Sequence, residues 1–129
     1  MTAVLDSWAA MAMLNAEPAA PRVRAAVEAG AVMSWINLGE VYYLTTRRRG
    51  EALARRAVES LQRRISVEEP DGALVMTASE IKARGRMSYA DAFCVATARR
   101  HGLPVYTGDP EIVALAGDDL EVVDLRSAP

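Results

Sequence analysis

The sequence contains very few of the residues that carry sulfur or imidazole chemistry. Its 129 residues include one cysteine, Cys94, and one histidine, His101. A single cysteine excludes an intramolecular disulfide and a zinc site built on cysteines, and it gives no sign of an oxidising compartment. We expect Cys94 to be a small buried apolar residue and His101, in Arg-Arg-His-Gly, to complement the dipole at a helix end. Hydrolases that need a Ser–His or Cys–His pair are therefore disfavoured.

The chain also lacks a long apolar run. No stretch reaches the roughly 18 uncharged apolar residues that a transmembrane helix needs. The N-terminal segment has no basic region, and Asp6 interrupts its apolar residues, which argues against a signal peptide. We therefore expect a cytoplasmic location and no contact with a membrane.

Lysine is nearly absent, since Lys82 is the only one. The other strongly basic residues are arginines, and half of them cluster at 47–49, 55–56 and 63–64. Guanidinium groups bind phosphate in a forked geometry that lysine lacks, so a net charge of −2 does not exclude a nucleic-acid ligand. The hydrophobic fraction of 51% and the charged fraction of 25% are ordinary for a globular protein, and the length predicts one domain over residues 1–129.

Short apolar runs of strand type alternate with helical patterns along the chain. This alternation is typical of an α/β fold with a parallel sheet. The expected strands are residues 2–6, 31–34, 65–68, 104–107 and 121–125. The expected helices are residues 7–15, 21–29, 37–49, 51–64, 71–83, 88–101 and 110–116.

Four acidic residues stand at the starts of expected helices. Asp6 ends the first strand, and Glu40 lies in the first turn of the helix after the second strand. Asp91 lies in the first turn of a later helix, and Asp109 directly follows the fourth strand. Ligands of open α/β sheets bind beyond the carboxyl ends of the strands, so these four side chains are the candidate site residues.

Two interpretations of these acids remain open. In the first, they only cap helices: Asn37 to Glu40 fits a capping box, Ser88 to Asp91 nearly does, and Asp109 precedes a proline at the first helical position. In the second, they form a site. Asp91 opens a run that is apolar nearly all round, so it is held near the core, where a carboxylate is costly without a partner.

A site made of these carboxylates would need a cation. Two ionised carboxylates about 5 Å apart repel by about 3 kcal/mol at an effective dielectric of 20. Protonation or a divalent cation must relieve such repulsion. An all-oxygen site indicates Mg²⁺ or Mn²⁺, which polarise phosphates and activate water. The chemistry that follows is phosphodiester hydrolysis.

Four segments, in this order and at this spacing, resemble the PIN domain (PilT N-terminal domain) family. The resemblance is specifically to VapC-type toxin ribonucleases of toxin–antitoxin pairs, and it spans essentially the whole chain. The segments that carry it are Val4-Leu5-Asp6-Ser7, residues 36–43, residues 87–93 with 96–98, and Tyr106-Thr107-Gly108-Asp109-Pro110-Glu111.

The resemblance implies a fold and a reaction. The fold is a three-layer α/β/α arrangement around a central parallel sheet in the order 3-2-1-4-5. The family's four acids fall on Asp6, Glu40, Asp91 and Asp109, which would bind Mg²⁺ or Mn²⁺ and direct a water at an RNA phosphate. Cleavage would leave 5′-phosphate and 3′-hydroxyl ends. A small cognate antitoxin that blocks the site and a homodimer are implied from the same source.

Several further residues bear on this reaction. Ser7 and Thr107 look like hydroxyl groups that orient the carboxylates or the water. The bulky Trp8 departs from many relatives and affects the shape of the pocket. The aromatic residues are expected in the core or an interface rather than stacked on bases; they are Trp8, Trp35, Tyr42 and Tyr43.

Some of the arginines are candidates for contacts with an RNA backbone. The candidates are Arg48, Arg49, Arg55 and Arg86. The alternative is a solvated helix face on which arginines pair with Glu51 and Glu59 at helical spacing.

Other functions remain as alternatives to a ribonuclease. A phospho-acceptor receiver domain also clusters acids at strand ends, but it needs an acidic pair after the first strand, and here Ser7 follows Asp6. It also needs a lysine after the last strand, where Arg126 stands. A non-catalytic interaction module, with all four acids as caps, is the other alternative. A P-loop is disfavoured because no Gly-x-x-x-x-Gly-Lys run occurs.

Overall fold

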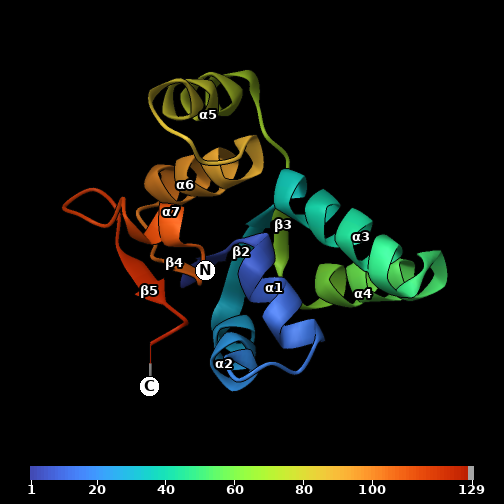
Figure 1. Ribbon diagram of the computed structural model, residues 1–129. Coiled ribbons are helices and arrows are strands. Elements are labelled where there is room, and N and C mark those ends of the chain that lie inside the picture. Colours follow the sequence, from blue (N-terminus) through green and yellow to red (C-terminus); the bar gives the residue numbers. More distant parts are fainter. Residues whose placement is uncertain (128–129) are drawn as a thin grey trace.

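The structure is a computed structural model that describes residues 1–127. Its five strands form one sheet in the order β3-β2-β1-β4-β5, and each neighbouring pair is parallel. Helices cover both faces of this sheet (Figure 1). The predicted α/β/α fold and strand order are therefore confirmed. The strands are β1 (Ala3–Leu5), β2 (Ala31–Ser34), β3 (Ser66–Glu68), β4 (Val105–Thr107) and β5 (Val122–Asp124).

The strand order also decides against one of the alternatives. A receiver domain has the flavodoxin-like order 2-1-3-4-5. In this chain β1 is central, because it pairs with β2 on one side and with β4 on the other. The receiver-like interpretation is therefore wrong.

The helices follow the predicted order. They are α1 (Ser7–Leu14), α2 (Ala20–Gly30), α3 (Trp35–Arg49), α4 (Glu51–Arg64), α5 (Gly72–Arg84), α6 (Tyr89–His101) and α7 (Pro110–Val113). Gly50 alone connects α3 to α4, and its φ of 89° lies in a region that other residues rarely adopt. The two helices consequently fold back against each other as a hairpin at one end of the sheet (Figure 1). None of the helices in the described chain is long and apolar enough to cross a membrane.

The start of α3 differs from the prediction. Ser34, the last residue of β2, caps this helix by accepting a hydrogen bond from the Ile36 backbone N–H, so the helix begins at Trp35. The predicted capping box is therefore wrong, and Glu40 lies in the second turn rather than the first. Asn37 is fully buried instead, and its side-chain amide donates to the backbone carbonyl of Ala90 at 3.1 Å. The Asn37 side chain thus makes a tertiary contact with another helix, whereas the sequence pattern predicts a local role in capping its own helix.

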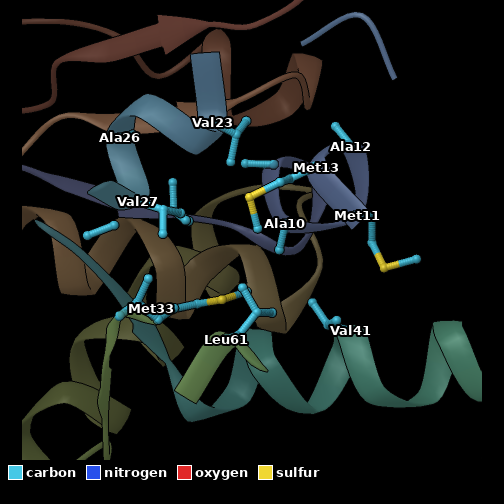
Figure 2. Packing of buried hydrophobic residues seen from close by; sticks show 14 of the residues in the cluster. Ala10, Met11, Ala12, Met13, Val23, Ala26, Val27, Met33, Val41 and Leu61 are labelled. Atoms are coloured by element: carbon cyan, nitrogen blue, oxygen red, sulfur yellow. The ribbon is translucent and has the colours of Figure 1, made fainter. Parts of the chain in front are cut away.

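Alternate residues of each strand enter opposite cores, which produces the three layers. Leu5 and Met33 belong to the core cluster formed with α1, α2 and α4. Figure 2 shows Met33 and Leu61 in this cluster. Val4 and Val32 face the other way, into a cluster built with α5, α6 and α7. Successive side chains of a strand point to opposite faces, so a sheet buried on both sides needs apolar residues at nearly every position.

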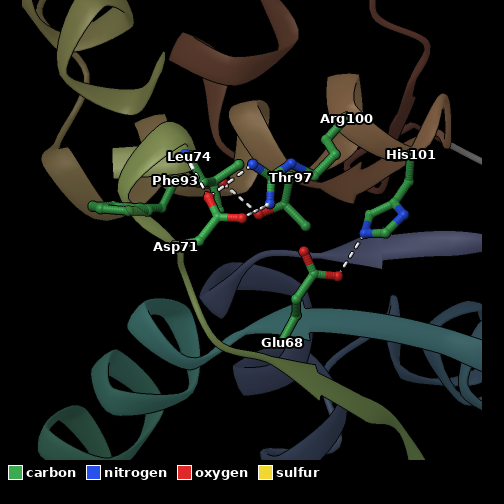
Figure 3. A network of polar contacts seen from close by, with 7 residues as sticks. All are labelled: Glu68, Asp71, Leu74, Phe93, Thr97, Arg100 and His101. Carbon is green, nitrogen blue, oxygen red and sulfur yellow. Dashed lines mark hydrogen bonds and ion pairs between the residues drawn. The ribbon is translucent and has the colours of Figure 1, made fainter. Parts of the chain in front are cut away.

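Helix α6 is the most buried helix. Every residue from Asp91 to Ala98 is buried, and Cys94 is a fully buried apolar residue as predicted. At its far end the Nε2 atom of His101 lies 2.5 Å from a carboxylate oxygen of Glu68 (Figure 3). Arg100 donates two hydrogen bonds to Asp71, the residue that caps α5. These contacts tie the C-terminal end of α6 to the edge strand β3 and to α5.

Candidate active site

The four predicted acids line one pocket of about 680 Å³. Asp6 directly follows β1 and Asp109 follows β4 by two residues, so both stand at the carboxyl edge of the sheet. Asp91 comes from the first turn of α6, and Glu40 comes from the second turn of α3. The structure therefore brings together all four side chains, although they are up to a hundred residues apart in the chain. His101 does not line this pocket and pairs with Glu68 instead.

Asp6 is held from two sides. It caps α1, because its Oδ1 accepts a hydrogen bond from the Ala9 backbone N–H at 2.8 Å, and its Oδ2 accepts one from the Thr107 hydroxyl. The Thr107 oxygen in turn accepts a hydrogen bond from the Asp109 backbone N–H at 2.9 Å. A carboxylate has two oxygens, so the role of a helix cap and the role of a site residue do not exclude each other at Asp6.

Burial controls the protonation of Asp6. The side chain is 1% exposed, and this desolvation raises the pKa of Asp6 from 3.8 to about 7. The hydrogen bonds from Thr107 and Ala9 favour the charged form, but they do not outweigh burial. The negative charges of Asp109 and Glu40 raise the pKa further.

Asp91 and Asp109 interact directly. The backbone N–H of Asp91 donates a hydrogen bond to the hydroxyl of Ser88, the residue that caps α6. Burial is the largest of the causes that raise the pKa of Asp91 to about 8. The second cause is Asp109, through its charge and through a hydrogen bond between the two carboxyl groups. Asp109 also caps α7 by accepting a hydrogen bond from the Glu111 backbone N–H at 2.8 Å. Burial and the neighbouring carboxylate therefore both favour the protonated form of Asp91.

Glu40 is positioned by contacts from two other helices. The Ser7 hydroxyl donates a hydrogen bond to Oε1 of Glu40, which links α1 to α3. One turn before Glu40, the side chain of Asn37 donates to the carbonyl of Ala90, the neighbour of Asp91. Sequence reasoning assigned Asn37 to a cap and missed this link between α3 and α6. No signal in the sequence distinguishes the two roles, because asparagine suits both.

The donor set fits a hard divalent cation. All four acids offer oxygen, and the raised pKa values of Asp6 and Asp91 reflect burial and repulsion between neighbouring carboxylates, both of which a bound cation would offset. Within residues 1–127, no three acidic, histidine or cysteine side chains stand close enough to hold one ion directly. An ion here would be held by fewer of them and by water, which Mg²⁺ accepts because it usually keeps several of its waters.

The predicted arginines separate into two groups. Arg48 and Arg86 line the same pocket as the acids. Arg49 lines a second, smaller pocket between α1, α3 and α4. Arg55 pairs with Glu51 at 2.7 Å on an exposed helix face, which is the solvated arrangement that the alternative interpretation describes. The structure therefore places only two of the four candidates beside the acids.

Two apolar residues that sequence reasoning did not single out also line the pocket. Met11 and Leu44 lie on α1 and α3, and both belong to the lining together with Trp8. A signal for them exists, since Met11 is four residues after Ser7 and Leu44 is four residues after Glu40. Residues at this spacing share one face of a helix.

The Thr107 hydroxyl is expected to control the protonation of Asp6. In Thr107→Val the hydroxyl donor is lost, so the pKa of Asp6 should rise above about 7, because this hydrogen bond favours the charged carboxylate. Titration of the side-chain carboxyl carbons by NMR, without divalent cations, measures the effect. Thr97→Val is the matched control, since the Thr97 hydroxyl is also buried but donates to the carbonyl of Phe93. An unchanged pKa in Thr107→Val would contradict the assigned contact.

The chain matches one protein family by sequence and several solved structures by fold. The sequence profile described as PIN domain matches residues 3–118. Solved structures of similar fold include a Mycobacterium tuberculosis toxin, VapC20, described as cleaving the sarcin–ricin loop, with 24% identity, a TM-score of 0.77, and coverage of 93% of this chain and 99% of that one. DNA-bound VapBC from Salmonella typhimurium has 17% identity and a TM-score of 0.77, with coverage of 97% and 98%.

VapBC-1 from nontypeable Haemophilus influenzae is a further structure of this kind, with 18% identity, a TM-score of 0.71, and coverage of 98% of this chain and 100% of that one. No curated protein sequence matches the chain. At these identities the structural likeness establishes the fold alone, whereas the profile match establishes the family.

Proposed function

Because the chain belongs to the PIN domain family, we propose that it is a metal-dependent endoribonuclease and the toxin of a toxin–antitoxin pair. The observation that carries this proposal is the meeting of Asp6, Glu40, Asp91 and Asp109 in one pocket. A chain that used these residues only as helix caps would have no need to gather them. Asp6 and Asp109 are indeed caps, which keeps a non-catalytic module as the second candidate, but Glu40 caps nothing and Asp91 lies behind its cap.

Each residue of the pocket has a proposed role in hydrolysis. Asp6, Asp91 and Asp109 would hold Mg²⁺ or Mn²⁺ directly or through water, and Glu40 would complete the set or orient the attacking water. When bound, the cation polarises the phosphate and lowers the pKa of a water. Thr107 keeps Asp6 in place, and Ser7 keeps Glu40 in place. Water attacks phosphorus and the 3′-oxygen leaves, so the products carry 5′-phosphate and 3′-hydroxyl ends.

RNA is the proposed substrate, and the two arginines beside the acids support this choice. Arg48 and Arg86 can contact phosphates on either side of the cut. One structural relative is described as a toxin that cleaves the sarcin–ricin loop. The cytoplasm, where RNA is abundant, is the proposed location.

A small antitoxin is the proposed protein partner. The solved VapBC relatives from Salmonella typhimurium and Haemophilus influenzae are complexes of this type. Six acidic side chains line the pocket, Glu17 and Glu111 in addition to the four predicted ones. Such a pocket attracts a basic side chain, so an antitoxin that inserts an arginine or a lysine would both neutralise and block it. A homodimer is proposed as well, and the mass of the purified chain measured by light scattering tests it.

Removal of divalent cations is expected to abolish cleavage. The purified chain, incubated with single-stranded RNA and Mg²⁺ or Mn²⁺, should produce fragments with 5′-phosphate ends, because the acids cannot activate water without a cation. EDTA should stop the reaction, and excess Mg²⁺ should restore it. Sequencing of the RNA ends measures both the activity and the cut position. Cleavage that persists in EDTA would refute the metal-dependent mechanism, and no cleavage of any RNA under all conditions would favour the non-catalytic module.

A further inference from the structure

The acidic pocket continues into an apolar stretch between α1 and α3. Trp8 and Met11 line it from α1, and Leu44 and Arg48 line it from α3. On α3, Glu40, Leu44 and Arg48 follow one another at intervals of four residues, so the acid, the apolar residue and the base lie in a row on one helix face. A phosphate or a cation makes no use of the apolar part of this row. The apolar part therefore fits another portion of the substrate.

The ring of Trp8 is held in a fixed place. Gly108 is buried between Thr107 and Asp109, and a Cβ atom at this position would overlap the six-membered part of the Trp8 indole. The ring therefore lies against the backbone of the loop that carries Asp109. Trp8 is half-buried and packs on the core that surrounds α1, while it still lines the pocket. An aromatic wall that is already in position loses little conformational entropy when a ligand binds.

Arg48 stands at the other end of the row without a partner in the chain. Within residues 1–127 no salt bridge involves Arg48, whereas Arg55 on the next helix is paired with Glu51. Its guanidinium group is thus available for an anion, and phosphate is the anion that its forked geometry fits. The groove offers an aromatic and apolar surface followed by a cation, which is the pattern that single-stranded nucleic acids require.

We propose that Trp8, Met11 and Leu44 form a subsite for one unpaired base of the RNA, next to the nucleotide that is cut, and that Arg48 binds the phosphate beyond it. The proposal rests on the proposed ribonuclease function and names the part of the substrate that the groove takes. Bases present an apolar face whatever their sequence, so the subsite selects for an unstacked, single-stranded base. It therefore restricts cleavage to loops and single strands.

The test compares the loss of Trp8 with the loss of the base. The substrate is a single-stranded RNA that the purified chain cleaves, and a second version carries an abasic nucleotide beside the mapped cut, tried in turn on each side. Trp8→Ala should raise KM for the intact RNA about tenfold or more, with a smaller change in kcat, because stacking on one aromatic is worth about that factor. The abasic RNA should show the same loss with the unmodified chain and no additional loss with Trp8→Ala.

Matched variants separate stacking from a structural role. Trp8→Phe should retain most of the affinity, and Trp35→Ala, which removes an exposed tryptophan outside the pocket, should change nothing. Arg48→Ala should weaken binding and reduce its salt dependence, whereas Arg63→Ala, on an exposed face of α4, should not. If Trp8→Ala fails to fold, Leu44→Ala tests the same wall, because Leu44 is half-buried on the surface of α3.

The outcomes distinguish this proposal from the proposed function. If the unmodified chain cleaves no RNA, the ribonuclease assignment fails and the subsite fails with it. If the chain cleaves intact and abasic RNA equally well at every position tried, the subsite is refuted while the nuclease stands. If Trp8→Ala cleaves normally but escapes inhibition by a co-expressed antitoxin, the groove belongs to the protein partner, and the subsite is likewise refuted.

Discussion

Replacing Asp91 with asparagine is expected to lower RNA cleavage by about a thousandfold or more without unfolding the chain. The side chain keeps its size and its place behind the Ser88 cap, but it can no longer supply a negative charge to a cation. Loss of several kcal/mol of charge stabilisation in the transition state corresponds to about three powers of ten in rate. Asp6→Asn should have a comparable effect, because Asp6 shares the pocket and is the more deeply buried of the two.

Initial rates of RNA cleavage in excess Mg²⁺ measure this loss. Asp118→Asn is the matched control, since Asp118 is an exposed aspartate that does not line the pocket, and its cleavage rate should stay unchanged. Circular dichroism and thermal unfolding verify that each variant is folded. Asp91→Asn that retains cleavage within about threefold of the unmodified chain would mean that this carboxylate does not take part in the reaction.

The second large effect concerns stability as a function of pH. Asp6 and Asp91 have pKa values of about 7 and about 8 in the folded chain, against 3.8 for an ordinary aspartate. A group whose pKa is raised by folding stabilises the fold fully below its unfolded pKa, and this contribution disappears as the pH rises through the folded pKa. Without divalent cations, the free energy of unfolding should therefore fall between about pH 5 and pH 8, by on the order of 4 kcal/mol.

Thermal unfolding in EDTA between pH 5 and pH 8 measures this fall, which corresponds to roughly 15 °C in Tm for a domain of this size. Arg100 lowers the pKa of Asp71, and Arg126 lowers the pKa of Asp124. These two carboxylates therefore do not titrate between pH 5 and pH 8. In Asp91→Asn the dependence should flatten, and at pH 8 this variant should be more stable than the unmodified chain. A Tm that rises from pH 5 to pH 8 in EDTA would contradict the raised pKa values.

Addition of Mg²⁺ supplies an internal control for the same experiment. A cation binds the charged carboxylates, so it should stabilise the unmodified chain most at pH 8, where protons compete least. The Asp91→Asn variant should gain less from Mg²⁺ than the unmodified chain does. Equal stabilisation of both proteins by Mg²⁺ would place the ion outside this pocket.

Both predictions depend on the burial and mutual repulsion of the carboxylates in the pocket. Without a cation, burial and mutual repulsion favour the protonated forms of Asp6 and Asp91. A bound cation would remove this repulsion and favour the charged forms, which are its ligands. Helix α6 carries Asp91 at the start of a buried run, so the carboxylate cannot turn out to solvent without moving the helix. Stability and activity therefore depend on the same charges in opposite directions.

Local patterns were sufficient where one element decides its own structure. Helix α6 ends at His101 as predicted and is closed by Gly102 in a left-handed conformation, and α5 begins behind its cap Asp71, the first residue of the predicted range. The boundaries of α4 and β2 agree with the predicted ranges as well. Helix caps, glycine at helix ends and apolar periodicity act within a few residues, so the local sequence is enough to predict them.

Local patterns failed where a distant residue competes for a side chain. Asn37 fits a cap in the sequence, but the carbonyl of Ala90 on another helix binds its amide, and Ser34 caps the helix in its place. The arginines were equally ambiguous. Arg48 reaches the pocket and Arg49, its neighbour, does not, because adjacent residues of a helix point in directions about 100° apart.

The linear sequence fixes which groups are available and the order of the elements: four acids at or near helix starts, a single histidine and a single cysteine, and alternating strands and helices. Only the tertiary structure decided which of these groups meet. It placed Asp6, Glu40, Asp91 and Asp109 around one pocket, held Glu40 with Ser7, and put Trp8 against Gly108 beside the acids. The reason is physical, because the order of the strands and the angles at which helices pack arise from burial over the whole chain, and no short segment contains them.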